Sequence, residues 1–216
     1  MTTVPDVRLN NGVAIPQLGL GTARLPDEET RRIVGEALEV SYRFVDTAAS
    51  YENERGVGQA LADSGLPREE VFVSTKLRGR EQGSASAKQA LRSSLDRLGL
   101  DFVDLYLVHW PLPRLDRYVE SWLAMEELLA EGLTRAIGVS NFLPAHLDRL
   151  AAESSTVPAV NQIECHPREP QLEQRAATDG KTGLLNAAAW HEQAERALQR
   201  VQRHGGAAGV LILDLD

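Results

Sequence analysis

Several side chains that can move or hold protons follow short apolar runs of the sequence. Asp46 ends FVD, Lys76 ends VFVSTK and His109 ends VDLYLVH, while Tyr51 follows Asp46 in the segment TAASYENE. A tyrosine hydroxyl, with a pKa of about 10, is a weak acid near neutral pH, but a neighbouring ammonium stabilises the tyrosinate and lowers that pKa. A carboxylate would keep the lysine charged, and an imidazole would orient a carbonyl oxygen. These residues suggest that Tyr51 donates a proton to a carbonyl that receives a hydride from a bound cofactor.

A second set of polar residues occupies equivalent places in later runs. Ser140 and Asn141 end AIGVSN, and Gln162 lies in AVNQIE. Active sites of parallel sheets and barrels form at the carboxyl ends of the strands. Taken alone, an Asp after a strand is most often a helix cap and a strand-end His is usually only hydrogen-bonded. Their shared position in successive strands favours one common site.

The elements that would position these residues alternate between short β-rich runs and amphipathic helical stretches. This alternation predicts parallel βα units, six of them up to about residue 165, preceded by a hairpin in VRLNNGVAI around Asn11-Gly12. The predicted strands are PQLGLGT, RFVDTA, VFVSTK, VDLYLVHW, TRAIGVSNF and PAVNQIECHP, and the predicted helices run from Pro26 to about Glu39, through NERGVGQALADSG, over Ser84 to Leu98, from about Leu115 to Glu131, and through AHLDRLAAES.

Parallel strands with covering helices form either a doubly wound sheet or a (β/α) barrel. The first turn, GLGTARLP, has only the opening half of the G-x-G-x-x-G spacing, which disfavours a Rossmann dinucleotide site. No G-x-S-x-G or comparable nucleophile arrangement is present, which argues against a hydrolase.

Six segments of the chain together resemble the aldo-keto reductase family, in the order and spacing of that family. They span roughly residues 5 to 175 and are GLGT, FVDTAASYENERGVGQAL, VFVSTKL, SLDRLGLDFVDLYLVHWP, IGVSNF and NQIECHP. The resemblance implies a (β/α)8 TIM-barrel fold and hydride transfer from NADPH to an aldehyde or ketone.

The resemblance also assigns roles to residues. It implies a catalytic tetrad of Asp46, Tyr51, Lys76 and His109, with Tyr51 as general acid and His109 also contacting substrate. It implies that Trp110 forms a wall of the substrate pocket, although packing of this aromatic at the barrel rim is an equally good reading. The cofactor residues that it implies are Gly21, Thr22, Asp46, Ser140, Asn141 and Gln162.

After about residue 174 the family pattern is no longer recognisable. We therefore expect residues 1–174 to form barrel units one to six and residues 175–216 to be a divergent tail. The tail could contain one helix over Leu184 to Arg203 and a short strand in GVLILDLD, for six to seven units in total. An eight-stranded barrel pairs its last strand with its first, so an incomplete barrel leaves strand edges open.

Two hypotheses account for such a tail. In the first, a shifted reading frame or a truncated gene of an ordinary reductase produces it. In the second, the chain is a genuine short variant whose barrel a partner chain completes. An inactive barrel that binds small molecules without turnover is the corresponding alternative function. The family implies a monomer, with self-association through unpaired barrel edges as the other possibility.

Composition limits the class of protein. The 216 residues carry a net charge of −8 without a Lys/Arg cluster, which argues against nucleic acid as a partner. No long apolar run or secretory leader is present, so we expect a cytoplasmic protein that does not bind membranes.

Cys165 is the only cysteine. Glu164, Cys165 and His166 are adjacent on a predicted strand and point to alternate faces, so we expect no metal site there; His146, His191 and His204 lack acidic or cysteine partners at useful spacing and are expected at the surface.

Overall fold

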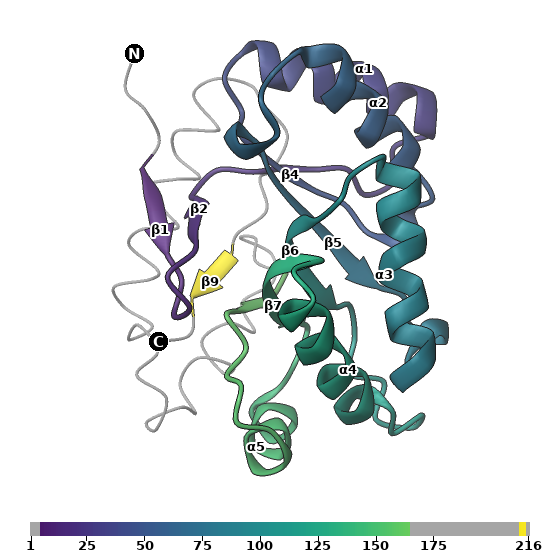
Figure 1. Ribbon diagram of the computed structural model, residues 1–216, viewed down its shortest axis with the longest axis vertical. Coiled ribbons are helices and arrows are strands. Elements are labelled where there is room, and N and C mark those ends of the chain that lie inside the picture. The colour runs from purple at the N-terminus through teal and green to yellow at the C-terminus, as the bar shows by residue number, and fades with distance from the viewer. Residues whose placement is uncertain (1–4, 165–211, 215–216) are drawn as a thin grey trace.

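A curled sheet of parallel strands with helices on its outer face forms the body of the protein (Figure 1). The computed structural model describes residues 5–164 and 212–214. The helices are α1 (Asp27–Glu39), α2 (Glu54–Ser64), α3 (Ser84–Leu98), α4 (Tyr118–Ala130) and α5 (Pro144–Glu153), with short 3₁₀ turns η1 (Ala49–Tyr51), η2 (Arg68–Glu70) and η3 (Gly79–Glu81). The strands are β1 (Asp6–Arg8), β2 (Ala14–Pro16), β3 (Leu20–Gly21), β4 (Phe44–Asp46), β5 (Phe72–Leu77), β6 (Val103–Val108), β7 (Thr134–Ser140), β8 (Val160–Gln162) and β9 (Ile212–Asp214).

The strands of the large sheet follow one another in chain order. β3 to β8 are hydrogen-bonded neighbours in sequence, and each pair is parallel. A helix connects each strand from β3 to β7 to the next one, which is the βα repeat that the sequence predicts. The six parallel strands and their covering helices confirm the α/β barrel type of fold.

The last described strand differs from the expectation for a further barrel unit. A strand is present within GVLILDLD, but β9 pairs with β8 in the antiparallel direction, with Val160 opposite Asp214 and Gln162 opposite Ile212. A seventh βα unit would run parallel to its neighbour, so β9 extends the sheet without adding such a unit. The predicted helix over Leu184 to Arg203 lies outside the described residues.

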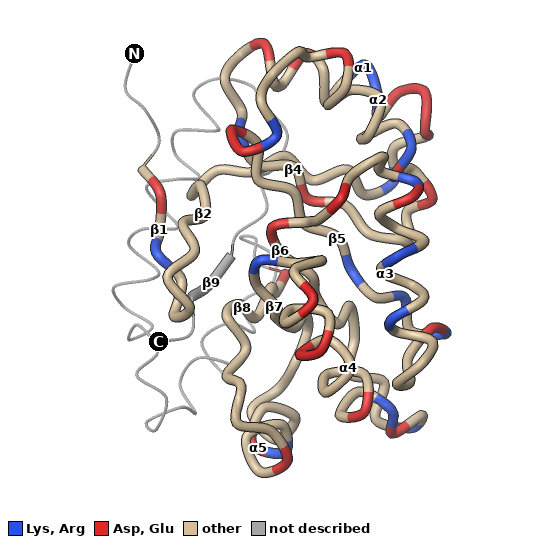
Figure 2. Tube along the Cα trace, viewed as in Figure 1, with Lys and Arg blue, Asp and Glu red and all other residues tan. Residues whose placement is uncertain are grey.

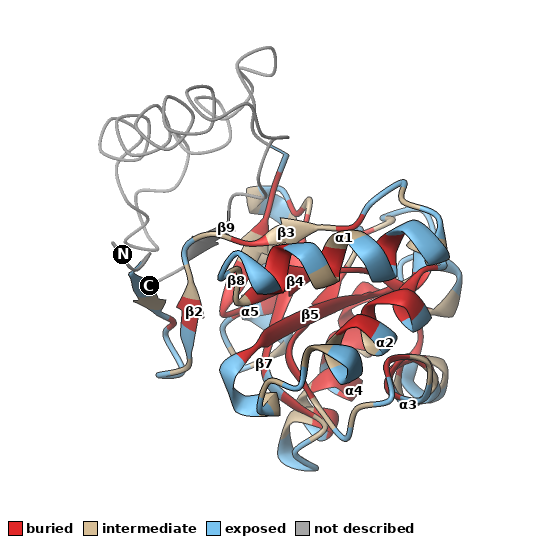
Figure 3. Ribbon diagram, turned by 90° about the horizontal axis from the view of Figure 1, so that it is seen from above, coloured by how far each residue is buried: buried red, intermediate tan, exposed pale blue. Residues whose placement is uncertain are grey.

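Two apolar clusters lie on opposite faces of the sheet, because successive side chains of a strand point to opposite sides. The outer cluster joins the strands to the helices and includes Val73, Val108 and Val139 with Trp122 of α4. The inner cluster, which we define as Leu9, Ile15, Phe44, Phe72, Leu105, Leu107, Ala136, Ala159 and Val160, fills the concave side. Figure 3 shows buried residues concentrated in the strands and on the sheet-facing sides of the helices.

The N-terminal hairpin closes one side of the inner cluster. β1 and β2 pair antiparallel around the turn that contains Gly12, whose φ of 85° fits the Asn-Gly turn expected from the sequence. Leu9 and Ile15 are both 3% exposed and belong to the inner cluster. The predicted hairpin is therefore confirmed, and it contributes core residues rather than lying free.

The helices begin and end within a few residues of the positions that the sequence predicts. Gly65 and Gly99 end α2 and α3 in the left-handed conformation that glycine adopts at low cost. α4 begins at Tyr118, three residues later than expected, because Leu115 and Asp116 lie in a loop in which Asp116 has a positive φ. The first predicted strand, Pro16 to Thr22, is divided between the end of β2 and the short β3.

Charged residues lie mainly along the helices and loops (Figure 2). Among the buried charged residues, Asp46 and Lys76 lie on β4 and β5, and Asp104 lies on β6. Of the helices that the structure describes, none is both long and apolar enough to cross a membrane.

Candidate active site

A buried ion pair lies at the carboxyl ends of β4 and β5. The parallel register places Asp46 opposite Ser74, and Lys76 is the next residue of β5 on the same inner face. Lys76 Nζ lies 2.6 Å from Asp46 Oδ2, and the two residues are 1% and 3% exposed. Ser74 Oγ donates to the other carboxylate oxygen, Asp46 Oδ1, at 2.5 Å. Both charges are thus paired and hydrogen-bonded, as burial requires.

The Lys76 ammonium also reaches the Tyr51 hydroxyl. Its three N–H groups have three acceptors, namely Asp46 Oδ2, the Thr47 carbonyl at 3.1 Å and Tyr51 Oη at 3.4 Å. The ammonium also lies 5.1 Å from the centre of the Tyr51 ring. The Lys76 ammonium is therefore the cation within hydrogen-bonding distance of the Tyr51 hydroxyl.

His109 completes the group predicted from the sequence. Its ring meets the Tyr51 ring edge-on, with centroids 5.7 Å apart, and its Nδ1 lies 3.2 Å from Ser50 Oγ. Burial, followed by the ammonium of Lys76, lowers the pKa of His109 to about 4, against a raising influence of Asp46. The imidazole is therefore neutral at physiological pH. A neutral imidazole can orient a carbonyl oxygen without delivering a charge to it.

Tyr106, on β6, has surroundings that differ from those of Tyr51. Tyr106 belongs to the outer cluster on β6 and is completely buried. Burial, then the carboxylates of Glu54 and Glu81, raise the pKa of Tyr106 well above its usual value. Tyr51 instead is half-buried at the end of η1, beside the Lys76 ammonium. Of the two, only Tyr51 has a cation within hydrogen-bonding distance of its hydroxyl in the described part of the chain.

Ser140, Asn141 and Gln162 meet where β7 and β8 end. Ser140 is opposite Gln162 in the sheet. The Ser140 hydroxyl and the Asn141 backbone N–H both donate to the backbone carbonyl of Gln162, at 2.9 Å each. Asn141 Nδ2 donates to the His109 carbonyl at 3.0 Å, which joins this group to the tetrad side of the site. The Gln162 side-chain amide nitrogen is buried and has no hydrogen-bond partner in the part of the chain that the structure describes. A buried N–H group of this kind is available to a ligand.

Gly21 and Thr22 follow the short strand β3. Gly21 is opposite Asp46, and the Thr22 hydroxyl, which is fully buried, donates to the Asp46 carbonyl at 3.2 Å. Trp110 lies next to His109 and is 51% exposed, with its ring 6.5 Å from the imidazole and close to parallel with it. Its large exposed area leaves it free to line a pocket at the rim.

Three residues of the site were not singled out from the sequence. Ser74 supports Asp46 and Ser50 contacts His109. Asn53 is completely buried, and its Nδ2 donates to the Thr22 and Leu25 carbonyls while Thr47 Oγ1 donates to its Oδ1. Strand alternation could have found Ser74, because it lies two residues before Lys76. Ser50 and Asn53 lie in an irregular segment, where no periodicity gives the direction of a side chain.

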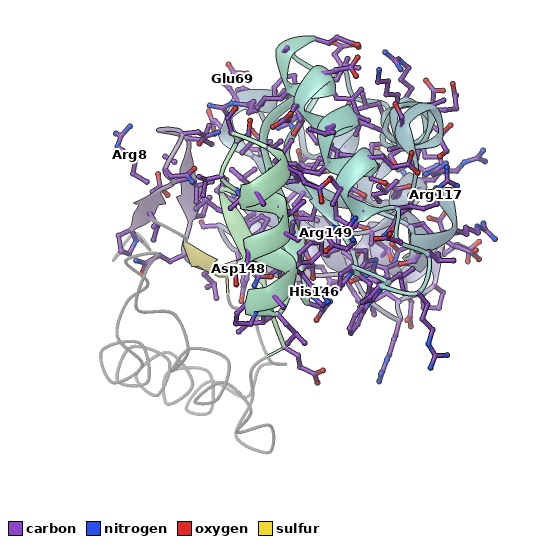
Figure 4. The ribbon with its side chains drawn as sticks, turned by 90° about the horizontal axis from the view of Figure 1, so that it is seen from below. Arg8, Glu69, Arg117, His146, Asp148 and Arg149 are labelled. Atoms are coloured by element: carbon purple, nitrogen blue, oxygen red, sulfur yellow. The ribbon has the colours of Figure 1, made fainter. Side chains whose placement is uncertain are left out.

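No group of three His, Cys, Asp or Glu side chains within residues 5–164 and 212–214 is arranged to hold a metal ion. Cys165, His166, His191 and His204 lie outside the described residues. His146, in the first turn of α5 (Figure 4), accepts a hydrogen bond from the Leu143 backbone N–H through Nδ1, and its ring meets the Tyr118 ring edge-on with centroids 5.8 Å apart. His146 is therefore part of the helix start.

Comparison with known proteins points to one family. The sequence pattern of the aldo/keto reductase family matches residues 16–190. An aldo-keto reductase of Mycobacterium avium is 53% identical over 174 residues, which is 81% of this chain and 61% of that protein. One of Mycobacterium tuberculosis is 50% identical over 173 residues, with 80% and 61% covered. The chain belongs to the aldo/keto reductase family, and it spans about three-fifths of the length of these relatives.

Solved structures of aldo-keto reductases are also similar to this chain. An aldo/keto reductase from Brucella melitensis superposes with a TM-score of 0.77 at 48% identity, over 80% of this chain and 68% of that chain. A Bombyx mori aldo-keto reductase in complex with NADP superposes with a TM-score of 0.75 at 38% identity, over 82% of this chain and 64% of that one. These matches show that the parallel strands and helices described above have the family's fold.

Proposed function

We propose that this protein is an oxidoreductase that uses NADPH to reduce an aldehyde or ketone to an alcohol. The observation that carries the proposal is the Lys76 ammonium, which is held by Asp46 and directed at the Tyr51 hydroxyl. This arrangement prepares a phenol to give up its proton. Membership of the family and the NADP complex of the Bombyx mori relative support the same chemistry.

The residues at the ends of β7 and β8 suit the carboxamide of a nicotinamide ring. A carboxamide has both a carbonyl acceptor and an N–H donor, and the unpartnered Nε2 of Gln162 offers a donor for the carbonyl. The Ser140 hydroxyl donates to the backbone carbonyl of Gln162, and Asn141 Nδ2 donates to Ser140 Oγ. We propose that these three residues hold the carboxamide and that Gly21, Thr22 and Asp46 line the cofactor cleft. When bound, the cofactor would supply the hydride.

The residues of this chain would handle the proton and the carbonyl. Tyr51 would donate its hydroxyl proton to the carbonyl oxygen as negative charge develops there. Lys76 would stabilise the resulting tyrosinate, and Asp46 would keep Lys76 charged and fixed in place. His109, neutral because of its lowered pKa, would orient the carbonyl oxygen, and Trp110 would form a wall of the substrate pocket.

Titration with NADPH followed by addition of a reactive aldehyde tests this function. The purified chain should bind NADPH, seen as a change in cofactor fluorescence, and should consume it when 4-nitrobenzaldehyde is added. Tyr51→Phe removes only the hydroxyl, so NADPH binding should remain while turnover falls by roughly 10²- to 10⁴-fold, the usual contribution of a general acid.

Tyr42→Phe is the matched control for Tyr51→Phe. Tyr42→Phe changes a tyrosine outside the site between α1 and β4, and it should leave turnover within about twofold. Unchanged turnover in Tyr51→Phe would show that another group is the acid. NADPH binding without any consumption by the unaltered protein would favour the alternative function, a barrel that binds small molecules without turnover.

A further inference from the structure

The Ser50 hydroxyl contacts the nitrogen of His109 that the proposed chemistry does not use. Ser50 Oγ lies 3.2 Å from His109 Nδ1, a hydrogen-bonding distance. A hydroxyl can donate to a ring nitrogen or accept from it, so this contact exists in two forms. In one form Ser50 donates and the ring proton is on Nε2. In the other the ring proton is on Nδ1 and Ser50 accepts it.

The surroundings of the ring allow one proton on the imidazole and no more near neutral pH. Burial and the nearby Lys76 ammonium lower the pKa of His109 to about 4, so the ring is neutral and has one N–H group. Lys76 has its three N–H groups directed at Asp46, Thr47 and Tyr51. Lys76 therefore has no proton left to donate to an unprotonated Nε2.

The position of that single proton decides whether His109 attracts or repels a carbonyl oxygen. An Nε2–H group donates to the oxygen, whereas an unprotonated Nε2 presents a lone pair to the lone pairs of the oxygen. We infer that Ser50 is a positioning residue whose hydroxyl donates a hydrogen bond to His109 Nδ1. This hydrogen bond keeps the ring proton on Nε2, where the N–H group can bind the substrate carbonyl. This inference rests on the proposed function for its consequence, but the tautomer itself can be measured without substrate.

Local structure keeps the serine at its place. Ser50 is the central residue of η1, and the Tyr51 backbone N–H donates to the Ala48 carbonyl at 2.9 Å to close this turn. An Arg78 guanidinium N–H donates to the Ala49 carbonyl and ties the turn to the end of β5. The same turn thus positions the proposed acid, Tyr51, and the residue next to it that acts on His109.

The plane of the imidazole is restrained in the same way. Its edge-on contact with Tyr51 has an interplanar angle of 81°, and its face lies at 23° to the Trp110 indole. A half-turn flip of the ring would exchange Nδ1 with Cδ2 and Nε2 with Cε1, so it would break the contact with Ser50. The serine contact therefore selects a tautomer of a ring whose orientation is already set.

Nitrogen NMR of histidine-labelled protein tests the inference directly. The ¹⁵N shifts of Nδ1 and Nε2 separate the two tautomers, and a His109→Asn variant identifies the His109 signals. We expect the Nε2–H tautomer in the unaltered protein and in Ser50→Thr, which keeps the hydroxyl. Ser50→Ala should give a mixture of tautomers. Ser50→Asp, whose carboxylate only accepts, should draw a proton to Nδ1.

Turnover of the aldehyde gives the second measurement. Ser50→Ala should lower kcat/KM roughly fivefold, about the effect of one neutral hydrogen bond, while Ser50→Thr should stay within about twofold. Ser50→Asp, measured near pH 8, should lower kcat/KM more than Ser50→Ala does. Ser93→Ala on α3 is the matched serine control, because the only side-chain hydrogen bond of Ser93 within the described residues comes from Gln89 Nε2, at 3.4 Å.

The possible outcomes separate this inference from the proposed function. An Nδ1–H tautomer in the unaltered protein, or a tautomer that Ser50→Ala does not change, would overturn the inference even if the enzyme is active. An Nε2–H tautomer that depends on Ser50, in a protein without turnover, would support the inference about the ring and contradict the proposed reaction. Loss of turnover in Ser50→Ala without a change of tautomer would assign Ser50 a purely steric effect.

Discussion

At the scale of single residues, the site depends on charges that are buried in pairs. Lys76 is 1% exposed, and its ammonium is tolerated there because Asp46 lies 2.6 Å away and Ser74 satisfies the other carboxylate oxygen. Removal of one member of such a pair typically costs about 3–5 kcal/mol, because the other charge is left unpaired. The pair of Asp46 and Lys76 is therefore a structural requirement of the barrel interior.

His109 makes stability depend on pH. Its pKa is about 4 in the folded protein and 6.5 when it is exposed, so the unfolded chain binds a proton between these values and the folded chain does not. The contribution of His109 to the free energy of unfolding is therefore fully present above about pH 6.5. It is lost as the pH falls toward 4, by about 2 kcal/mol between pH 7 and pH 5. Urea unfolding at these two pH values measures the loss.

The same experiment with His109→Gln isolates this contribution. Glutamine does not titrate, so the variant should lose about 2 kcal/mol less than the unaltered protein over the same interval. An equal loss in both proteins would mean that carboxylates elsewhere, and not His109, dominate the acid sensitivity.

At the scale of elements, the close approach of β7 and β8 depends on a glycine. A Cβ at Gly138 would lie 2.6 Å from the Val160 carbonyl oxygen and 2.7 Å from Leu107 Cδ2. Backbone cannot give way as a side chain can, so Gly138→Ala should push β8 away and cost about 1–3 kcal/mol in unfolding experiments. It should also weaken NADPH binding, because Ser140 and Gln162 are the next inward residues of these strands.

Gly35 offers a matched control for that substitution. A Cβ at Gly35, inside α1, meets no atom within 4 Å. Gly35→Ala should therefore raise stability by about 0.5–1 kcal/mol through helix propensity and leave NADPH binding unchanged. Equal effects of the two alanine substitutions would contradict the close approach of the strands.

The sequence predicts elements better than it predicts contacts between them. Strands with alternating faces and helices that end at Gly65 and Gly99 are local features, so the six units and the clustering of Asp46, Lys76 and His109 at one end could be foreseen. The contacts of Ser50 and Asn53 depend on irregular turns, and the antiparallel direction of β9 depends on a pairing distant in the sequence. No periodicity encodes such features.

At the scale of the whole molecule, the residues that the structure describes form two apolar clusters, one on each face of the curled sheet, and the hairpin completes the inner one. Leu9→Ala would leave a cavity in the inner cluster, since Leu9 is 3% exposed, and should cost about 2–4 kcal/mol. Thermal or urea unfolding followed by circular dichroism measures this loss.

An exposed residue provides the comparison. Val40, which follows α1, is 71% exposed, and Val40→Ala should change stability by no more than about 0.5 kcal/mol. A Leu9→Ala variant as stable as Val40→Ala would show that the hairpin is not part of the folded core.

The register of β4 and β5 has a consequence for how the length of this chain can vary. Asp46 and Lys76 share the inner face only because Lys76 lies two residues beyond Ser74, the partner of Asp46. One residue inserted between Phe72 and Lys76 would turn the ammonium toward the helices and leave the carboxylate alone. Several residues inserted in the loop between His109 and α4 would leave that pair untouched. That loop can therefore change in length without disturbing the pair, whereas β4 and β5 must keep theirs.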